Sequence, residues 1–371
     1  NLAMQNPHYE GYSKDGGKYW VKAERAQQEL GNLNLVKLTG ISGEITDGNR
    51  QRTTLAAARG TFDVDTHVLE LYDSIDVAGD TGISARLTRA SVQTKENIIT
   101  SNEPVAVAMT AGRITSQRMT AQQKSKTYAF IDAVKAQFKA RGDANPNPAA
   151  APLIGQSTGP IDVNANRLDV DDARKIAVFS GAVTASQDGA TLATPELEVH
   201  YDGAATEKGG KGGGGSVTRL IAKDPVTVKQ ANGDTVASRN ADFDPASKRA
   251  LFSGDVVMQQ SPDKRVTADT ADLDQAANTI VLTGAVGVTQ GGNRLAGQRL
   301  VFNRQTNQMQ LTAPSAAPGG GRISARFTQN GGVRQPEAAA ESNRQGIAFG
   351  ATFKTDPNAP IDIEAARLDV D

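Results

Sequence analysis

Two glycine-containing motifs in the sequence have the spacing of known catalytic or nucleotide-binding sites. Gly155-Gln156-Ser157-Thr158-Gly159 matches the nucleophile elbow of a hydrolase, and residues 210–215 match the glycine spacing of a dinucleotide-binding loop. The elbow needs a strand before the serine and a helix after it, whereas a stretch rich in Pro and Ala surrounds Ser157. The second motif lies in a tract made almost entirely of glycine, which fits the spacing trivially. We therefore expect no enzyme and no cofactor.

The residues that commonly bind metals do not have the spacing of a metal site. Asp169, Asp171 and Asp172 could be proposed as calcium ligands, but acids that follow a strand so closely fit better as turn residues. The chain has no cysteine, which excludes thiol catalysis, disulfides and Cys-type zinc sites. The three histidines are scattered and suit surface or groove-edge positions, and they are His8, His67 and His200. We expect no metal site.

Pairs of basic residues could bind the phosphates of a lipid, because charge-assisted hydrogen bonds to phosphate are strong. The solvated face of a strand explains such pairs equally well. Lys and Arg number 40 against 41 Asp and Glu, and the resulting net charge of −1 argues against a nucleic-acid partner. The pairs are Arg50 and Arg52, Lys124 and Lys126, Lys248 and Arg249, and Lys264 and Arg265.

The elements that carry these residues are set by a repeated phrase of large apolar residue, hydroxyl, Gly, any residue and Val. It occurs at residues 179–187, 252–260 and 282–290. Apolar residues fall at period two on one face of the first copy, which predicts a half-buried strand. The central Gly predicts a bulge or sharp bend, since it tolerates backbone angles that other residues avoid. A bent strand gives a curved sheet.

An apolar–acid element precedes each phrase, as in Leu168-Asp169, Phe243-Asp244 and Leu273-Asp274. Together they describe strand, polar turn, strand. The last two copies are offset by 30 residues, which indicates a hairpin unit repeated in register. With 38% apolar and 5% aromatic residues, the chain suits several thin cores better than one large core. We predict an all-β, antiparallel fold.

Composition and repeats divide the chain into five segments. Residues 1–138 repeat the hairpin pattern weakly, with residues 61–77 parallel to residues 167–183 position for position. Residues 139–159 form a linker rich in Pro and Ala, and residues 160–330 form a second module. Residues 331–359 form a low-complexity linker. Residues 360–371 match residues 160–171 at nine of twelve positions, so we expect the start of a further, truncated module.

These patterns resemble those of the lipopolysaccharide-transport proteins. Residues 160–330 resemble the LptA or OstA-like family through the repeated phrase. Residues 1–138 resemble the periplasmic domain of the LptC family. The residues that carry the LptC resemblance are Asn6-Pro7, Gly11-Tyr12, Lys18-Tyr19 leading to Ala23 and Ala26, Gly60-Thr61-Phe62-Asp63, and Ser101-Asn102-Glu103-Pro104-Val105.

The resemblance implies β-taco or β-jellyroll modules in tandem, each a sheet folded over an apolar groove. In the family, acyl chains of lipid A occupy the groove, and modules join by edge-strand pairing. Implied partners are lipopolysaccharide, an inner-membrane ABC transporter complex and an outer-membrane LptD-like N-terminal domain, with head-to-tail self-association as a further possibility. We expect a periplasmic protein that passes lipopolysaccharide towards the outer membrane, tethered to the inner membrane by a segment missing from this chain.

Parity along the strands predicts which residues line the groove, although plain core packing explains the same residues without a ligand. In the first module they are Phe62, Val64, Leu69, Leu71, Val105, Val107 and Phe130. In the second module they are Ile161, Val163, Phe179, Val183, Leu197, Val199, Phe252, Val256, Leu282 and Val286.

The first and last strands of each module are the predicted docking edges, because an exposed edge can accept a strand from another module. They are residues 19–26 and 128–138 in the first module and residues 160–168 and 322–327 in the second. Two other classes stay open. One is a structural or adhesive β-repeat protein with a closed core, and the other is a β-helical polysaccharide-active enzyme, which the lack of an acid cluster flanked by aromatics disfavours.

Overall fold

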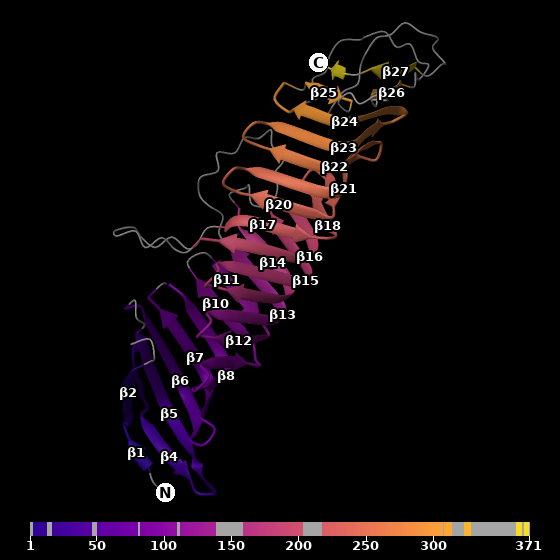
Figure 1. Cartoon of the computed structure of the whole chain (residues 1–371). Helices are drawn as coiled ribbons and strands as arrows, with labels where there is room; N and C mark the ends of the chain where they lie inside the picture. Colours follow the sequence, from indigo (N-terminus) through magenta and orange to yellow (C-terminus); the bar gives the residue numbers. More distant parts are fainter. Residues whose placement is uncertain are drawn as a thin grey trace. The chain divides into compact units, whose positions relative to one another are not determined.

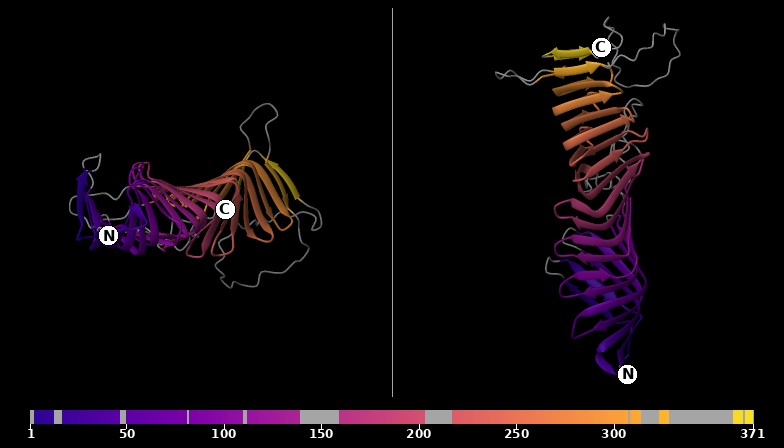
Figure 2. Two further views of the ribbon diagram at one scale, coloured as in Figure 1. Left: turned by 90° about the horizontal axis from the view of Figure 1, so that it is seen from below. Right: turned by 90° about the vertical axis from the view of Figure 1, so that its right-hand side faces the viewer.

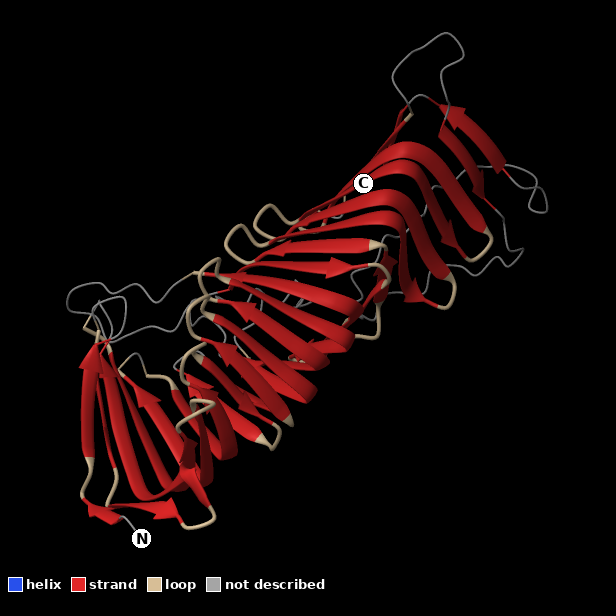
Figure 3. Cartoon of the chain, turned by 60° about the horizontal axis from the view of Figure 1, so that its bottom comes forward, coloured by secondary structure: helices blue, strands red, loops and turns tan. Residues whose placement is uncertain are grey.

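A computed structural model describes residues 3–12, 17–46, 50–80, 82–109, 112–138, 159–202, 217–306, 308–313, 323–327, 361–365 and 367–370. All regular secondary structure among these residues is β-strand (Figure 3), and neighbouring strands run antiparallel. The predicted all-β, antiparallel fold is confirmed. The glycine tract at 209–215 and nearly all of both predicted linkers, 139–159 and 331–359, lie outside the described residues.

The chain divides into two compact units, and the first comprises residues 1–143, 158–187 and 196–218. Figure 1 labels most of its strands. They are β1 (Ala3–Gln5), β2 (His8–Tyr12), β3 (Lys18–Lys22), β4 (Arg25–Glu29), β5 (Asn32–Thr46), β6 (Arg52–Asp63), β7 (Val68–Gly79), β8 (Ser84–Gln93), β9 (Ile98–Ser101), β10 (Val105–Met109), β11 (Gly112–Ser116), β12 (Arg118–Gln122), β13 (Thr127–Phe138), β14 (Ile161–Asp171) and β15 (Ile176–Gln187).

The second unit comprises residues 144–157, 188–195 and 219–371. Two strands contribute residues to both units, namely β16 (Ala190–Tyr201) and β17 (Val217–Lys223). The remaining strands are β18 (Val226–Lys229), β19 (Thr235–Ser238), β20 (Asn240–Asp244), β21 (Arg249–Ser261), β22 (Lys264–Asp274), β23 (Thr279–Gln290), β24 (Asn293–Asn303), β25 (Met309–Thr312), β26 (Ile323–Phe327), β27 (Ile361–Ala365) and β28 (Arg367–Val370).

Long strands in both units bend at two consecutive residues in the left-handed region. In β15 these are Gly181 and Ala182, with φ of +79° and +49°. The ladder to the neighbouring strand shifts register at this point. The magenta strands in the right-hand view of Figure 2 fold back at such bends. The same pair of left-handed residues recurs at Asp73-Ser74 in β7, Asp132-Ala133 in β13, Gly254-Asp255 in β21 and Gly284-Ala285 in β23.

The bends confirm the predicted role of the glycine in the repeated phrase. Glycine adopts positive φ without a steric cost, and Asp tolerates the left-handed region better than most residues do. This explains why Asp73 and Asp132 replace the glycine in the first module. Each bend lies between a large apolar residue and a Val or Ile that are both at most 5% exposed, and these pairs are Leu71 and Ile75, Phe130 and Val134, Phe179 and Val183, Phe252 and Val256, and Leu282 and Val286.

The strands between the bent ones match them with two consecutive outward residues. In β14, Asn166 and Arg167 are exposed between buried Ala165 and Leu168. The alternation of inward and outward side chains therefore shifts by one residue where the neighbouring strand bends. As a result, the apolar side chains on both sides of the bend face the same interior. Each sheet is thus folded over a narrow apolar layer.

Acidic side chains close the hairpin turns. Asp171 and Asp172 lie at such a turn, as predicted, whereas Asp169 lies within β14 and forms an ion pair with Arg167, so the prediction for Asp169 is wrong. The Asp244 carboxylate accepts hydrogen bonds from the backbone N–H groups of Ala246 (2.9 Å) and Ser247 (3.1 Å). The Ser247 hydroxyl and these N–H groups lower the pKa of Asp244. The side chains that accept backbone N–H groups in the corresponding turns are those of Asp63, Asp171, Asp274 and Asn303.

The structure corrects the alignment of residues 61–77 with 167–183 by two positions. The turn acid Asp63 corresponds to Asp171, and the bend residue Asp73 corresponds to Gly181. An Asp repeats at period two in both segments, so a shift of two residues keeps the inward and outward pattern and raises the count of identities. Sequence identity therefore favours the wrong alignment.

A second correction concerns residues 19–26, predicted as one edge strand. They belong to β3 and β4, which are interrupted at Ala23 and Glu24. β3 pairs with β2 and β5, and β4 pairs with β1 and β5. Neither strand is an edge, because β1 and β2 pair with them on the side opposite to β5.

Candidate functional site

The candidate site is the apolar interior between the two halves of each folded sheet. Of the predicted lining residues, thirteen are at most 9% exposed in this interior, and they are Leu71, Val105, Val107, Phe130, Val163, Phe179, Val183, Leu197, Val199, Phe252, Val256, Leu282 and Val286. Three are half-buried near strand ends, and they are Phe62, Leu69 and Ile161. Their burial is common to a lipid groove and to a plain core.

Val64 does not belong to this set, since its side chain is 41% exposed. β6 ends at Asp63, and the Val64 N–H donates to the carbonyl oxygen of Asn34 at 2.9 Å. Alternation along a strand no longer sets the direction of a side chain once the chain has entered the turn. The prediction for Val64 is therefore wrong.

Other interior residues were not among the predicted lining residues. Phe243 packs edge-to-face against Phe252, with ring centroids 5.6 Å apart, and Leu168 is 1% exposed opposite Phe130. Each is the apolar residue of an apolar–acid element that precedes a bent strand, so this element could have predicted both. Phe138 belongs to the interior of the first unit through its contact with Phe179, whose ring centroid is 6.3 Å away.

The interior continues across the join between β13 and β14. These strands pair from Thr127 with Asp171 to Phe138 with Ile161, on both sides of the bend. Phe138 follows the bend in β13 and Phe179 precedes the bend in β15, so their contact joins the two halves of the fold. The Gln137 amide donates to Asp162 at 2.8 Å. One apolar layer is therefore shared by strands on either side of the predicted linker.

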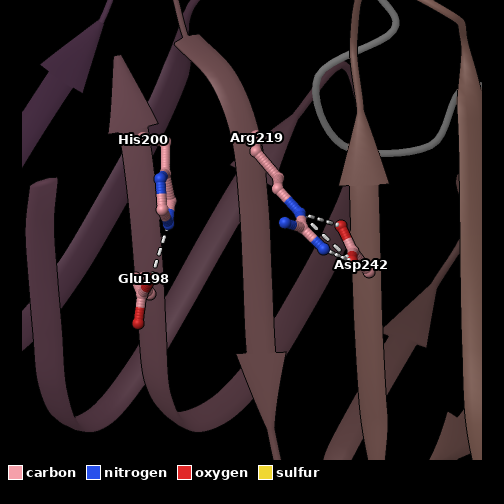
Figure 4. A network of polar contacts seen from close by, with 4 residues as sticks. All are labelled: Glu198, His200, Arg219 and Asp242. Atoms are coloured by element: carbon pink, nitrogen blue, oxygen red, sulfur yellow. Dashed lines mark hydrogen bonds and ion pairs between the residues drawn. The ribbon is translucent and has the colours of Figure 1, made fainter. Parts of the chain in front are cut away.

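The outward faces carry ion pairs rather than a reactive cluster. Arg167 Nε lies 2.6 Å from Asp169 Oδ2. Figure 4 shows two further pairs, in which His200 Nε2 lies 2.5 Å from Glu198 Oε1 and Arg219 Nε donates to Asp242 at 2.9 Å. Among the described residues there is no group of three or more His, Cys, Asp or Glu that could hold a metal ion.

A polar cluster lies at the turn end of the β13–β14–β15 region. Asp172 accepts hydrogen bonds from the Lys175 ammonium at 2.8 Å and from the Tyr201 hydroxyl at 3.2 Å. Burial, followed by the Asp172 charge, raises the pKa of Tyr201 well above its usual value. The same two causes raise the pKa of Tyr128. The Tyr201 phenol therefore stays protonated in the ordinary pH range and donates to Asp172.

Lys264 is an unusual member of the predicted basic pairs, because it is only 6% exposed. Burial lowers its pKa, and the charges of Asp234 and Asp263 offset part of that effect. Its cross-strand neighbour Gln290 carries a buried side-chain oxygen without a hydrogen-bond partner. Arg52 and Arg249 of the other pairs bind Asp80 and Asp272 on exposed faces, as expected of solvated strands.

A shallow hollow of about 550 Å³ lies over the β12–β15 region on the outward face. Its lining includes Ala129, Ile131, Ile176 and Val178, which alternate with the buried interior residues of the same strands. The Arg167–Asp169 pair closes one side. No helix among the described residues is long and apolar enough to cross a membrane.

Comparisons with known proteins place two families on the chain. Residues 1–139 match the family described as lipopolysaccharide-assembly, LptC-related. Residues 162–233 and 265–359 match the family described as LptA/(LptD N-terminal domain) LPS transport protein.

Two individual proteins are also similar to parts of this chain. An uncharacterized protein of Rhizobium meliloti (strain 1021) is 28% identical over 155 residues, which are 42% of this chain and 66% of that protein. The chain therefore spans just under two thirds of the length of this relative. The crystal structure of LptH, the LptA homologous periplasmic component of the lipopolysaccharide transport device of Pseudomonas aeruginosa, is 19% identical, covering 48% of this chain and 96% of that chain with a TM-score of 0.21.

Residues 1–139 therefore belong to the LptC-related family of lipopolysaccharide-assembly proteins, and residues 162–233 and 265–359 belong to the LptA/LptD N-terminal family of lipopolysaccharide-transport proteins.

Proposed function

We propose that this protein is a non-enzymatic component of a periplasmic bridge that carries lipopolysaccharide from the inner towards the outer membrane. The apolar interior would shield the acyl chains, and an inner-membrane ABC transporter would supply the driving force. Partners at the two ends would be further components of the same transport system. The single observation that carries this proposal is the continuous apolar layer across β13 and β14, where LptC-related and LptA-type parts meet.

The energetic need for such a layer is large. Burial of apolar surface is worth about 0.8 kcal/mol per methylene, so an acyl chain of about 12 carbons costs roughly 10 kcal/mol to expose to water. A sheet folded over on itself offers apolar side chains while its ladder satisfies the backbone groups. The interior near the join contains many small residues, including Ala136, Ala165, Ala177 and Ala185, which leave the two halves joined by few large contacts.

Phe179 is 0% exposed, so an acyl chain can reach it only if the two halves of the fold separate. The Phe138–Phe179 contact is then the point that must open. We expect lipid to replace this contact. Because the contact is between side chains only, it can break without loss of the ladder between β13 and β14.

Photocrosslinking tests the proposal with a matched pair of sites on one strand. A photoreactive residue at Phe179 faces the interior, and the same residue at Val178 faces outward. With purified lipopolysaccharide, we expect lipid adducts at position 179 and few at position 178, measured by mass spectrometry. Equal yields at the two sites, or no lipid adduct at position 179, would contradict the proposal.

A tethered variant separates opening from binding. The chain has no cysteine, so Phe138→Cys with Phe179→Cys introduces a single pair of thiols. A short thiol–thiol crosslinker should hold the halves closed and abolish lipid capture at a photoreactive Val183, whereas the uncrosslinked variant retains it. Capture that survives the tether would place lipid elsewhere.

A structural repeat protein with a closed core is the second candidate. Full burial of Phe179 and Phe252 favours it, because a permanently packed core would look the same. In that case lipopolysaccharide would leave no adduct at interior positions, and the tether would have no consequence.

A further inference from the structure

The chain contains two nearly identical strands, each of which pairs with the last strand of a preceding module. The first is β14, and the second is formed by β27 and β28. The sequences of residues 160–171 and 360–371 differ at three positions, where Val163, Asn164 and Asn166 of the first copy correspond to Ile, Glu and Ala in the second. We call the two copies docking strands.

The two docking strands pair in the same register with different partners. Ile161 lies opposite Phe138 and Ile361 opposite Phe327, while Leu168 lies opposite Phe130 and Leu368 opposite Leu311. Between the partners of residues 165 and 167 the first ladder shifts register, from Val134 to Ile131, and between the partners of residues 365 and 367 the second ladder passes from β26 to β25. The ends of two different modules therefore pair with the same phrase in the same way.

The inward residues of the two module ends belong to the same size classes. The partners of residues 168 and 368 are both large, namely Phe130 and Leu311. The partners of residues 165 and 365 are both β-branched, namely Val134 and Ile323, and those of residues 163 and 363 are both alanine, namely Ala136 and Ala325. All six partner residues are at most 5% exposed. A cross-strand neighbour of similar volume is what a buried pair requires.

The other cross-strand partners also permit exchange. Lys135 lies opposite Asn164 and Ser324 opposite Glu364, while Gln137 and Arg326 each lie opposite an Asp of the docking strand. Moving Glu to position 164 would set it against Lys135, and moving Asn to position 364 would set it against Ser324. Neither exchange places like charges opposite each other, which is the arrangement that destabilises a cross-strand pair.

We propose that the docking strands are interchangeable, so that either module end accepts either copy in the same register. Strand pairing at a module end would then require only a docking strand and would not distinguish the two copies. The covalent order of the chain would decide which module follows. A further LptA-type module beginning with this phrase fits the same two ends. The proposal concerns strand pairing and does not depend on lipid transport.

The test replaces one docking strand by the other in the full chain. In the variant Val163→Ile, Asn164→Glu and Asn166→Ala, two cysteine pairs report the register on the two sides of the bend, namely Ala129→Cys with Asp169→Cys and Gln137→Cys with Asp162→Cys. These are Cα partners in the ladder. A third pair, Ala129→Cys with Arg167→Cys, reports a slip by two residues.

With a short thiol–thiol crosslinker, we expect yields of both in-register pairs within about twofold of the unexchanged chain, because the exchange sets no like charges opposite each other. The slip pair should stay unlinked. Loss of an in-register crosslink, linking of the slip pair, or a lower unfolding temperature of the variant than of the parent would overturn the proposal. Leu168→Glu, which places a charge in the buried ladder, is the control that must lose the in-register signal.

The reciprocal exchange tests the other end. Ile363→Val, Glu364→Asn and Ala366→Asn convert the second docking strand into the first, and Gln310→Cys with Asp369→Cys is its in-register pair. We expect this pair to crosslink as in the parent. Success at one joint and failure at the other would show that the ends are selective and would refute interchangeability.

Discussion

The bend in the long strands can be tested at Gly254, because a matched glycine, Gly233, lies in the same unit. Gly254 has φ of +80°, and a Cβ there would lie 2.9 Å from Cβ and 3.0 Å from Cγ of Arg239. Gly233 has φ of +91°, and a Cβ there would meet nothing within 4 Å. Alanine at either position adopts a left-handed backbone, which costs roughly 1–2 kcal/mol. Only Gly254→Ala also forces Arg239 away.

The close approach sets the size of the difference. Moving Cβ of Arg239 adds to the backbone cost, so Gly254→Ala should lose more stability than Gly233→Ala, which should lose about 1–2 kcal/mol. Calorimetric melting of the two variants beside the parent measures this order. Gly254→Asn should be milder than Gly254→Ala, since Asn tolerates the left-handed region. Equal losses for the two alanine variants would refute the close packing at the bend.

Three further perturbations follow from individual contacts. Lys264→Met should raise the unfolding temperature at pH 7, because burial lowers the pKa of Lys264 and its charged form destabilises the fold. The parent gains stability as the pH rises towards the ordinary lysine pKa of 10.5, so the difference in unfolding temperature between variant and parent should shrink there. A pH-independent difference would argue against this cause. Asp244→Ala should cost about 1 kcal/mol above pH 4 in denaturant unfolding, and the cost should vanish as the pH falls through the lowered pKa of Asp244, where the parent also loses the carboxylate. A double-mutant cycle of Phe138→Leu and Phe179→Leu should show about 0.5–1.5 kcal/mol of coupling across the fold, whereas additive losses would mean that the rings do not stabilise each other.

Sequence patterns predicted the class of the fold because strand parity and the bend glycine are local properties. The large apolar residue and the Val around Gly181, Gly254 and Gly284 are buried as expected. Asp132 and Asp73 carry the same bend without glycine, so the glycine of the repeated phrase did not predict the first of them. The second was missed, because Leu71 and Ile75 were aligned two residues away from their structural counterparts.

The candidate site was predictable as an apolar interior, whereas its limits were not. Val64 has the parity of a lining residue, but the strand ends one residue before it, and strand ends depend on the turn that follows. The pairing of β4 with β1 removed another expected edge, because parity along one strand carries no information about how many neighbours it has. Such long-range pairing is decided by the whole sheet.

The bend has a consequence for how proteins of this kind change in length over evolution. Alternate long strands carry the fold-over point within themselves, as at Gly254-Asp255 and Gly284-Ala285, and no loop has to create it. Phe252 and Leu282, which precede successive bends, are thirty residues apart. A tandem duplication of that span would therefore insert one bent strand together with the strand that pairs with it. The apolar interior would become longer without any compensating substitution.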